Sequence, residues 1–341
     1  MQIMKIFYFT GLLIFLSGCN NIQNDKRSIE NSSDKLSLQD TIINSSPQNQ
    51  NINMDTVDTS QIFEIRSYKD ILDLFDELDY TPETWQAGIR LVPRVFIINV
   101  GERWGNSTTK EISVEYKKRI FFRGLAPLIL RSNELIMKDR NRLEKIRSGF
   151  SRSNKISETD MKWIHRLATL YKVDSDENEL SSEMIDELWK RVDIIPASLA
   201  LSQGATESGW GTSRFAAAGN ALYGQWTWGK DAMIPEEQRK GLGNYGIAAF
   251  GSILESVSAY MLNLNTHNAY ADLRNKRAEL REKGEKITGY ILAEQLTRYS
   301  ERGQSYVNSI KSMMDFNQLN PVDDAFLSND PPMYLIPVSD E

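Results

Sequence analysis

The sequence predicts a mostly helical protein of the α+β class, in which a small β-lobe interrupts a helical body. Apolar residues recur at spacings of three and four over much of the chain after residue 66, which is the period of amphipathic helices. Serines stand just before several of these runs, as helix-capping residues do. The 341 residues are 40% apolar and include 13 Tyr, 13 Phe and 7 Trp, which is enough for a large core.

The net charge and the small numbers of cysteine and histidine exclude several classes of function. The formal net charge is −6, from 40 basic and 46 acidic residues, so we expect no nucleic acid partner held by bulk charge. One cysteine and two histidines exclude an internal disulfide, a thiolate zinc site, an iron–sulfur cluster and a three-histidine metal site. The phosphate-binding glycine motifs of nucleotide enzymes are also missing. We therefore expect no metal and no cofactor.

Residues 1–18 predict a lipoprotein signal peptide. Lys5 precedes an almost unbroken apolar run over residues 6–16, which is too short to span a bilayer and is typical of a secretory signal. The Leu-Ser-Gly before Cys19 resembles a bacterial lipobox, in which the cysteine is lipidated and becomes the first residue. The alternative is an ordinary signal peptide in which Cys19 has no role. We expect export to the cell envelope and a lipid anchor in a bacterial membrane, facing the periplasm or the exterior.

Residues 19–61 predict a disordered tether. Residues 20–60 contain no aromatic residue and are mostly Asn, Ser, Gln, Asp and Thr, so they bury too little apolar surface to offset the entropy of ordering. By random-coil scaling, a tether of this length reaches roughly 35–40 Å. Such a reach suits an anchored protein that works away from its membrane.

Residues 62–150 predict a helical N-terminal region. Ser67 can cap its first helix, and residues 91–100 predict a strand or a buried turn. A long helix is expected over about 110–147, kinked or divided by Pro127. Its outer face is basic, which fits either contact with an anionic polymer or lipid surface, or a solvated face with internal ion pairs. The basic residues are Lys117, Lys118, Arg119, Arg123, Arg131, Lys138, Arg140 and Arg142.

Residues 151–320 form the second predicted region, after a polar break around residue 150. Helices are expected at about 157–172, 182–193, 196–208, 252–265, 288–299 and 304–316. The small β-lobe is expected between about 224 and 250. Beyond Asn320 the chain is acidic and dotted with prolines, so we expect residues 321–341 to form an irregular tail.

The segment from Gln203 to Gly224 carries the candidate chemistry. Its one acid, Glu207, falls in the last turn of the helix expected at 196–208, which Gly209 ends. The negative end of the helix dipole and partial burial beside Trp210 both disfavour a negative charge, so both raise the pKa of the carboxyl. A general acid near neutral pH needs such a raised pKa. The alternative is an ordinary glutamate at a helix end.

Two motifs in this segment resemble those of the glucosaminidase family of cell-wall hydrolases (glycoside hydrolase family 73). They are Glu207-Ser208-Gly209-Trp210-Gly211-Thr212-Ser213 and Asn220-Ala221-Leu222-Tyr223-Gly224. The resemblance is strongest to the Bax-like bacterial branch. It extends forward to residues 262–270 and 299–306 and, more weakly, back over the helix at residues 121–143, so it covers roughly residues 90–320. It implies a lysozyme-like α+β fold, cleavage of the β-1,4 glycan strand of peptidoglycan, and a role for Glu207 as the general acid.

Further site residues are assigned on the same resemblance. The family places a tyrosine near the acid, and we favour Tyr299 over Tyr306 as this catalytic residue, because Tyr306 also fits an apolar stripe with Ile310. Trp226 and Trp228 can stack on sugar faces or pack in the core. The predicted substrate-binding residues are Gln203, Trp210, Asn220, Tyr223, Trp226, Trp228 and Tyr306.

The second carboxylate of a glycosidase is missing from its expected place. Glycoside hydrolysis normally uses two acids. Relatives tend to carry the second shortly before the phenylalanine that is Phe250 here, and this chain has Gly246 there. The nearest substitutes as catalytic residues are Glu236 and Glu237. Our hypothesis is that the lobe holds no fixed base, and that the enzyme relies on the substrate's 2-acetamido group or on a loop that brings Glu236 or Glu237 inward.

The sequence therefore predicts an exported, membrane-anchored endo-β-N-acetylglucosaminidase that acts on the glycan strands of peptidoglycan. A lytic transglycosylase is an alternative, because it also uses one glutamate on a lysozyme-like fold. An alternative from another class is a non-catalytic wall-binding lipoprotein that keeps the groove without turnover.

Overall fold

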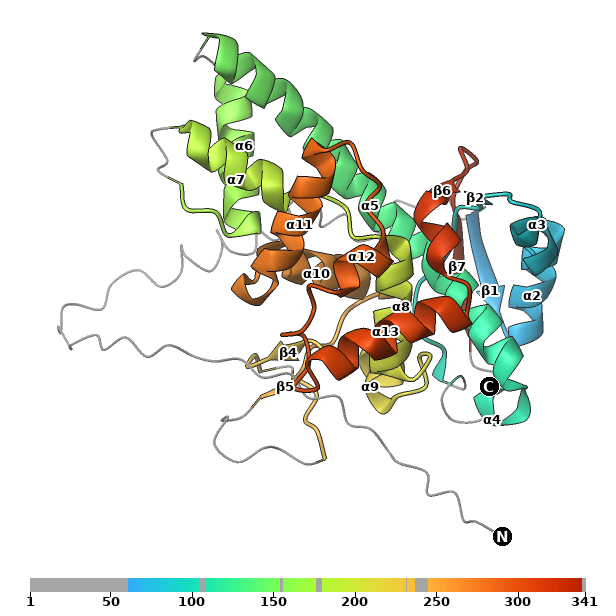
Figure 1. The fold of residues 1–341 in the computed structure, drawn as a ribbon. Helices are drawn as coiled ribbons and strands as arrows, with labels where there is room; N and C mark the ends of the chain where they lie inside the picture. The colour runs from blue at the N-terminus through green and yellow to red at the C-terminus, as the bar shows by residue number, and fades with distance from the viewer. Residues whose placement is uncertain are drawn as a thin grey trace, which may run out of the picture.

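The computed structural model describes residues 61–102, 104, 108–153, 156–175, 180–230, 232–236 and 245–338 (Figure 1). The predicted signal peptide and tether, Cys19 and Glu237 lie outside these residues. The described part is mostly helical with small sheets, which confirms the predicted fold class. Of the helices described, none combines the length and apolar character needed to cross a membrane.

Both ends of the described chain meet in one parallel sheet. Strands β1 (Ile62–Ile65) and β3 (Val95–Ile97) pair with opposite edges of β7 (Met333–Pro337). A second parallel pair joins β2 (Leu91–Val92) to β6 (Phe326–Leu327). The strand or buried turn expected over residues 91–100 is therefore strand.

The expectation of an irregular tail over residues 321–341 is wrong for the part that the structure describes. The tail contains β6 and β7, preceded by a 3-10 helix, η5 (Asn320–Asp324). Asp323 of η5 accepts hydrogen bonds of 2.8 Å from the backbone N–H groups of Ser198 and Gly289, and so binds the tail to the starts of two helices. Nonlocal pairing of short strands outweighs the local signal of the prolines.

The helices before residue 160 follow the prediction at the start and are not divided at Pro127. Ser67 caps α2 (Tyr68–Glu77) in a capping box with Asp70, and two short helices that the sequence did not predict follow it. They are α3 (Pro82–Gln86) and α4 (Thr109–Glu111). Helix α5 (Val114–Ser153) continues through Pro127 rather than being divided there. Leu128 and Ile129 beside the proline are fully buried, so tertiary packing holds this helix together.

Most helices after α5 lie where the sequence predicts them. The confirmed ones are α6 (Glu158–Tyr171), α7 (Ser182–Arg191), α8 (Ala197–Ser208), α10 (Ile253–Thr266) and α13 (Gln304–Phe316). Helix α12 (Gly289–Ala293) is shorter than the predicted 288–299. The elements that the sequence analysis missed are α9 (Arg214–Gly219), η4 (Asn268–Tyr270) and α11 (Ala271–Glu282).

The small β-lobe is present between residues 224 and 250. Strand β4 (Trp226–Thr227) pairs in antiparallel fashion with β5 (Gly246–Ile247), and Met233 forms a further bridge to Ile247. The lobe follows α9 and leads into α10.

Helix α8 lies at the centre of the fold, in contact with α5, α12 and α13 (Figure 1). Its buried residues are mostly Ala, Ser, Leu and Gly, so neighbouring helices approach it closely. Helix α5 contacts β3 as well as α8 and α10, and the buried residues of both predicted regions form one apolar cluster. The N-terminal region and the region after residue 150 therefore share a core.

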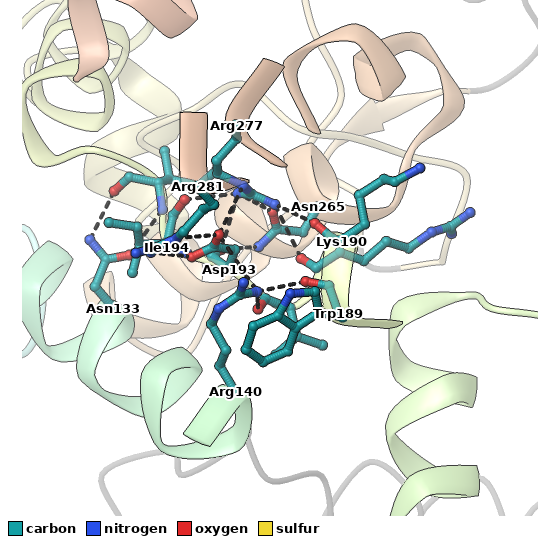
Figure 2. A network of polar contacts seen from close by, with 12 residues as sticks. Asn133, Arg140, Trp189, Lys190, Asp193, Ile194, Asn265, Arg277 and Arg281 are labelled. Carbon is teal, nitrogen blue, oxygen red and sulfur yellow. Dashed lines mark hydrogen bonds and ion pairs between the residues drawn. The ribbon is translucent and has the colours of Figure 1, made fainter. Parts of the chain in front are cut away.

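A buried ionic network, which we call the Asp193 network, joins α5, α7, α10 and α11 (Figure 2). The Asp193 carboxylate accepts hydrogen bonds of 3.0 and 2.7 Å from Arg281, and lies 3.6–3.7 Å from Arg140 and Arg277. Arg277 also donates to the backbone oxygen of Lys190 near the end of α7. The predicted place of Arg140 on a basic outer face is wrong, because its side chain is buried in this network.

Candidate active site

Glu207 lies in the last turn of α8, where the central helix reaches the surface. The residues of α8 up to Ala205 are buried, and Glu207 itself is half-buried. Gly209 ends the helix in the left-handed conformation (φ 58°, ψ 46°), as the sequence predicts. The carboxyl is thus attached to a rigid element and still open to a ligand.

A chain of three hydrogen bonds leads from the core to Glu207. Tyr260 Oη of α10 donates to Gln203 Oε1 over 2.6 Å, and Gln203 Nε2 donates to Tyr306 Oη over 2.9 Å. Tyr306 Oη of α13 then donates to Glu207 Oε1 over 2.9 Å. We call these four side chains the Glu207 relay.

The orientation of the Gln203 amide sets the direction of the hydrogen bonds in the relay. Because Tyr260 donates to the amide oxygen of Gln203, the amide nitrogen must face Tyr306. That nitrogen can only donate, so Tyr306 Oη accepts from it and its own hydrogen points to Glu207. In this orientation Glu207 Oε1 is an acceptor, which leaves Oε2 for the exchangeable proton of the carboxyl.

Stacked tyrosines surround the relay. Tyr299 stacks on Tyr306 with ring centroids 5.3 Å apart, and Tyr223 stacks on Tyr260 at 3.9 Å. Tyr270 lies 5.7 Å from Tyr299. Burial raises the pKa of all five hydroxyls, so each ring stays neutral and can only donate or accept a hydrogen bond.

Burial is also the main influence on the acid itself. It raises the pKa of Glu207 to about 7, while the hydrogen bond from Tyr306 and the positive charge of Arg302 act in the opposite direction. The sequence analysis predicted this direction from the helix end and from Trp210. In the structure, buried and stacked tyrosines lie around the relay that holds Glu207.

The turn after Glu207 is a tight structure with an unusual backbone. Gly209, Trp210 and Gly211 all have positive φ, of 58°, 60° and 75°, which is rare for a tryptophan. Ser208 Oγ accepts from the Gly211 N–H at 2.8 Å, and Trp104 Nε1 donates to the Trp210 oxygen at 2.9 Å. The turn is therefore fixed from inside and from the N-terminal region.

A cavity of about 460 Å³ lies behind this turn rather than around Glu207. Gly211 and Trp104 line it, together with residues of α5, α9 and the strands of the parallel sheet. The hydrogen-bond geometry and the raised pKa, not this cavity, make Glu207 the candidate for chemistry.

The structure joins three of the predicted site residues, Gln203, Glu207 and Tyr306, by hydrogen bonds. Gln203 and Tyr306 belong to the relay with Glu207, so Tyr306, and not the favoured Tyr299, is the tyrosine that contacts the acid. Tyr299 supports Tyr306 by stacking and is itself buried. Gln203 is fully buried, so it positions Tyr306 instead of contacting a substrate.

Two further residues predicted to bind substrate are structural. The Tyr223 ring is fully buried against Tyr260 and cannot stack on a sugar. Asn220 is buried, and its side chain accepts from the Val100 N–H at 2.9 Å and donates to the Phe250 oxygen at 3.0 Å. It ties the end of α9 to the loops beside it.

The tryptophans and the substitute acids lie at the surface. Trp226 is half-buried and stacks on Tyr245 with centroids 4.3 Å apart, and Trp228 is exposed. Both lie in the β-lobe, where a sugar ring can reach them. Glu236 is exposed and lies 4.0 Å from Arg214, while Glu237 lies outside the described residues.

The position of the missing carboxylate has no room for a side chain. A Cβ atom on Gly246 would lie 2.7 Å from the Ala232 Cβ and 2.8 Å from the Met233 oxygen. The glycine is therefore part of how this lobe packs, and the chain could not carry an acid here without moving its backbone.

The sequence analysis missed Tyr260 and Tyr270 as parts of the site. Tyr260 falls on the apolar stripe of α10 with Val257 and Met261, so its pattern indicates core packing. The sequence signal that could have identified Tyr260 is its hydroxyl group, together with a polar residue able to bind it. A fully buried tyrosine needs a partner for its hydroxyl, and Gln203 is a polar residue on the buried part of α8.

Comparison with known proteins agrees with this geometry. The family described as mannosyl-glycoprotein endo-beta-N-acetylglucosaminidase, the glucosaminidase family, matches residues 182–319. Protein bax of Escherichia coli (strain K12) is 35% identical over 205 residues, which are 59% of this chain and 70% of that protein. No solved structure shows a significant match. The matched range includes Gln203, Glu207, Tyr260 and Tyr306, and the chain belongs to the glucosaminidase family of glycoside hydrolases, in its Bax-like branch.

Proposed function

We propose that this protein is an endo-β-N-acetylglucosaminidase that cleaves the β-1,4 glycan strand of peptidoglycan, with Glu207 as its general acid. The observation that carries the proposal is a half-buried carboxyl with a pKa of about 7, held by Tyr306 at the end of the central helix. Such an acid is substantially protonated near neutral pH, as proton donation to a leaving group requires.

The relay suits the proton transfer. Glu207 donates the proton on Oε2 to the glycosidic oxygen as the bond from that oxygen to the anomeric carbon breaks, and the leaving sugar departs as an alcohol. Glu207 is then a carboxylate, and the hydrogen bond from Tyr306 to Oε1 becomes charge-assisted and stronger. Tyr306 therefore favours the charged state that forms during the reaction.

The nucleophile that attacks the anomeric carbon is not a carboxylate at the position where relatives tend to carry one. Gly246 has no room for a side chain, and Glu236 is exposed and near Arg214. The proposal therefore assigns the nucleophile to the substrate. The carbonyl oxygen of its 2-acetamido group attacks the anomeric carbon, and water later opens the cyclic intermediate, as in other substrate-assisted glycosidases.

Digestion of purified peptidoglycan, followed by mass spectrometry of the products, tests the function. New reducing ends should be N-acetylglucosamine, and Glu207→Gln should cut the rate by at least about a thousandfold, or ~4 kcal/mol of barrier. Glu236→Gln is the matched control and should cost at most about tenfold. Ends that are 1,6-anhydro-N-acetylmuramic acid would assign a lytic transglycosylase, and no cleavage by the wild type would favour a wall-binding protein.

The same proposal includes export and a lipid anchor on Cys19. It rests on the apolar run over residues 6–16 and the Leu-Ser-Gly-Cys sequence that ends it. Cys19→Ala should move the protein from the membrane fraction to the soluble exported fraction, as measured by fractionation and immunoblotting. Equal membrane binding of both forms would remove Cys19 as the anchor.

A further inference from the structure

Three side chains from separate elements meet on the surface beside the Trp210 turn. The Nζ atom of Lys118, on the first turns of α5, lies 4.6 Å from the ring centroid of Phe316 and 5.7 Å from that of Trp210. Both distances are within the range of cation–π contacts. Phe316 is the last residue of α13, and Trp210 belongs to the turn that follows Glu207.

The side chain of Phe316 points to solvent and is not part of the packed face of α13. Its side chain is 79% exposed, the highest value among the large apolar residues that the structure describes as exposed. The face of α13 that packs on α8 is formed by other residues, which are Tyr306, Val307, Ile310 and Met314. The phenylalanine therefore adds little to the core, although a single exposed apolar residue needs no explanation by itself.

The cluster is connected to the candidate active site by two rigid elements. Helix α13 carries Tyr306, which donates to Glu207, and Phe316 follows ten residues later, about 15 Å further along the helix axis. Trp210 is three residues after Glu207 and is held by Trp104 and Ser208 on either side of the turn. A polymer bound across Glu207 can reach as far as Phe316, whereas a single sugar in the site cannot.

The chemistry of the cluster matches a sugar that bears an acidic group. Aromatic rings offer apolar area to the face of a sugar. Lys118 adds a positive charge beside the two rings, which can pair with the carboxylates of the peptides that peptidoglycan sugars bear. Neutral glycans supply the first feature and lack the second.

We propose that Lys118, Trp210 and Phe316 form a distal glycan-binding subsite that holds a peptide-bearing sugar of the same strand that Glu207 cleaves. The subsite rests on the proposed function for the identity of its ligand. It makes the enzyme prefer long strands over short fragments, because only long strands fill the active site and the subsite together.

The test compares Phe316→Ala and Lys118→Gln with the wild type on two substrates, long peptide-bearing glycan strands and short peptidoglycan fragments. The ratio of kcat/KM for long strands to kcat/KM for short fragments should fall about tenfold in Phe316→Ala, through KM. Lys118→Gln should lower the ratio less, and only when the strands keep their peptides. Phe326→Ala, which removes another exposed phenylalanine on β6, is the matched control and should leave the ratio unchanged.

The two proposals fail in different ways. If the wild type cleaves long strands and Phe316→Ala has the same ratio, the subsite is overturned and the proposed function stands. If the wild type cleaves nothing, sedimentation with intact peptidoglycan decides. Weaker binding of Glu207→Gln/Phe316→Ala than of Glu207→Gln supports the subsite, and equal binding overturns it.

Discussion

Asp193 and Glu207 are both acids near the C-terminal end of a helix, and the chain surrounds them with opposite partners. Asp193 is buried among Arg140, Arg277 and Arg281 (Figure 2). Burial alone raises a carboxyl pKa, but these positive charges outweigh it and hold the pKa of Asp193 below its ordinary value. Glu207 has one hydrogen bond from a neutral tyrosine, and burial raises its pKa to about 7.

The difference separates a structural acid from a chemical one. The lowered pKa keeps Asp193 ionised near neutral pH, so its charge can join helices but it has no proton to give there. Glu207 changes its protonation state near neutral pH, so it can give a proton and take one back. The arginines keep the carboxyl of Asp193 ionised, while the neutral tyrosines around Glu207 let its carboxyl titrate near neutral pH.

The largest expected effect is a loss of stability at the Asp193 network. Asp193→Asn leaves buried arginines without their counter-charge, so the free energy of unfolding should fall by about 3–5 kcal/mol. Urea unfolding at pH 7 measures it. The control is Asp186→Asn, which breaks an exposed pair with Arg147 and should cost less than about 1 kcal/mol. Similar losses of unfolding free energy in both variants would mean that Asp193 contributes no more to stability than an exposed ion pair.

The second effect has the opposite sign and depends on pH. Because the folded pKa of Glu207, about 7, lies above its ordinary value of 4.5, Glu207 costs stability as pH rises from about 4.5 to 7. Glu207→Gln removes that cost. It should therefore stabilise the protein by about 2–3 kcal/mol at pH 8 and change nothing at pH 4. Thermal melts at both pH values check this, and a variant that is destabilised at pH 8 would contradict it.

A smaller effect is expected from Tyr306→Phe, and its readout is a pH profile. The hydrogen bond from Tyr306 favours the carboxylate, so its loss raises the pKa of Glu207 further. The alkaline limb of the profile should move to higher pH, while kcat at the optimum falls about tenfold, or ~1.4 kcal/mol. The neighbours that act on Glu207 electrostatically, Arg302 and the other buried tyrosines, stay in place. An alkaline limb that moves to lower pH would show that the bond has another role.

The smallest effect should come from Tyr260→Phe, two steps away from the acid. Without the Tyr260 hydroxyl the Gln203 amide can turn round and compete with Glu207 for the Tyr306 hydrogen. We expect kcat to fall two- to fivefold and the alkaline limb to move in the same direction as in Tyr306→Phe. The matched control is Tyr223→Phe, which removes an equally buried hydroxyl with no hydrogen-bond partner on the stacked ring. If both variants behave alike, the relay does not position Glu207.

Local patterns were enough to predict the helices that carry the site. The apolar spacing of α8, the glycine that ends it and the position of Glu207 in its last turn all follow from neighbouring residues. The capping box at Ser67 follows from Asp70 three residues later. The raised pKa of Glu207 was also predictable in direction, because helix ends and burial act in known ways.

Features that depend on distant residues were not predictable. Helix α11 was missed because two of its residues, Arg274 and Arg277, look like surface residues and are buried. Arg140 was misplaced for the same reason, since its partner Asp193 is far away in the sequence. The choice between Tyr299 and Tyr306 needed the angle at which α13 crosses α8, which no periodicity contains.

The position of β7 has a consequence for the order in which the molecule folds. Ile62 pairs with Tyr334, so almost the whole described chain lies between the two partners. Loop closure over such a length is slow, and during synthesis the central strand is the last part of the sheet to emerge. Helices α5 to α10 can form from local contacts before that. Strands β1 and β3 can pair only after β7 has been synthesised, so we expect this sheet to form late in folding.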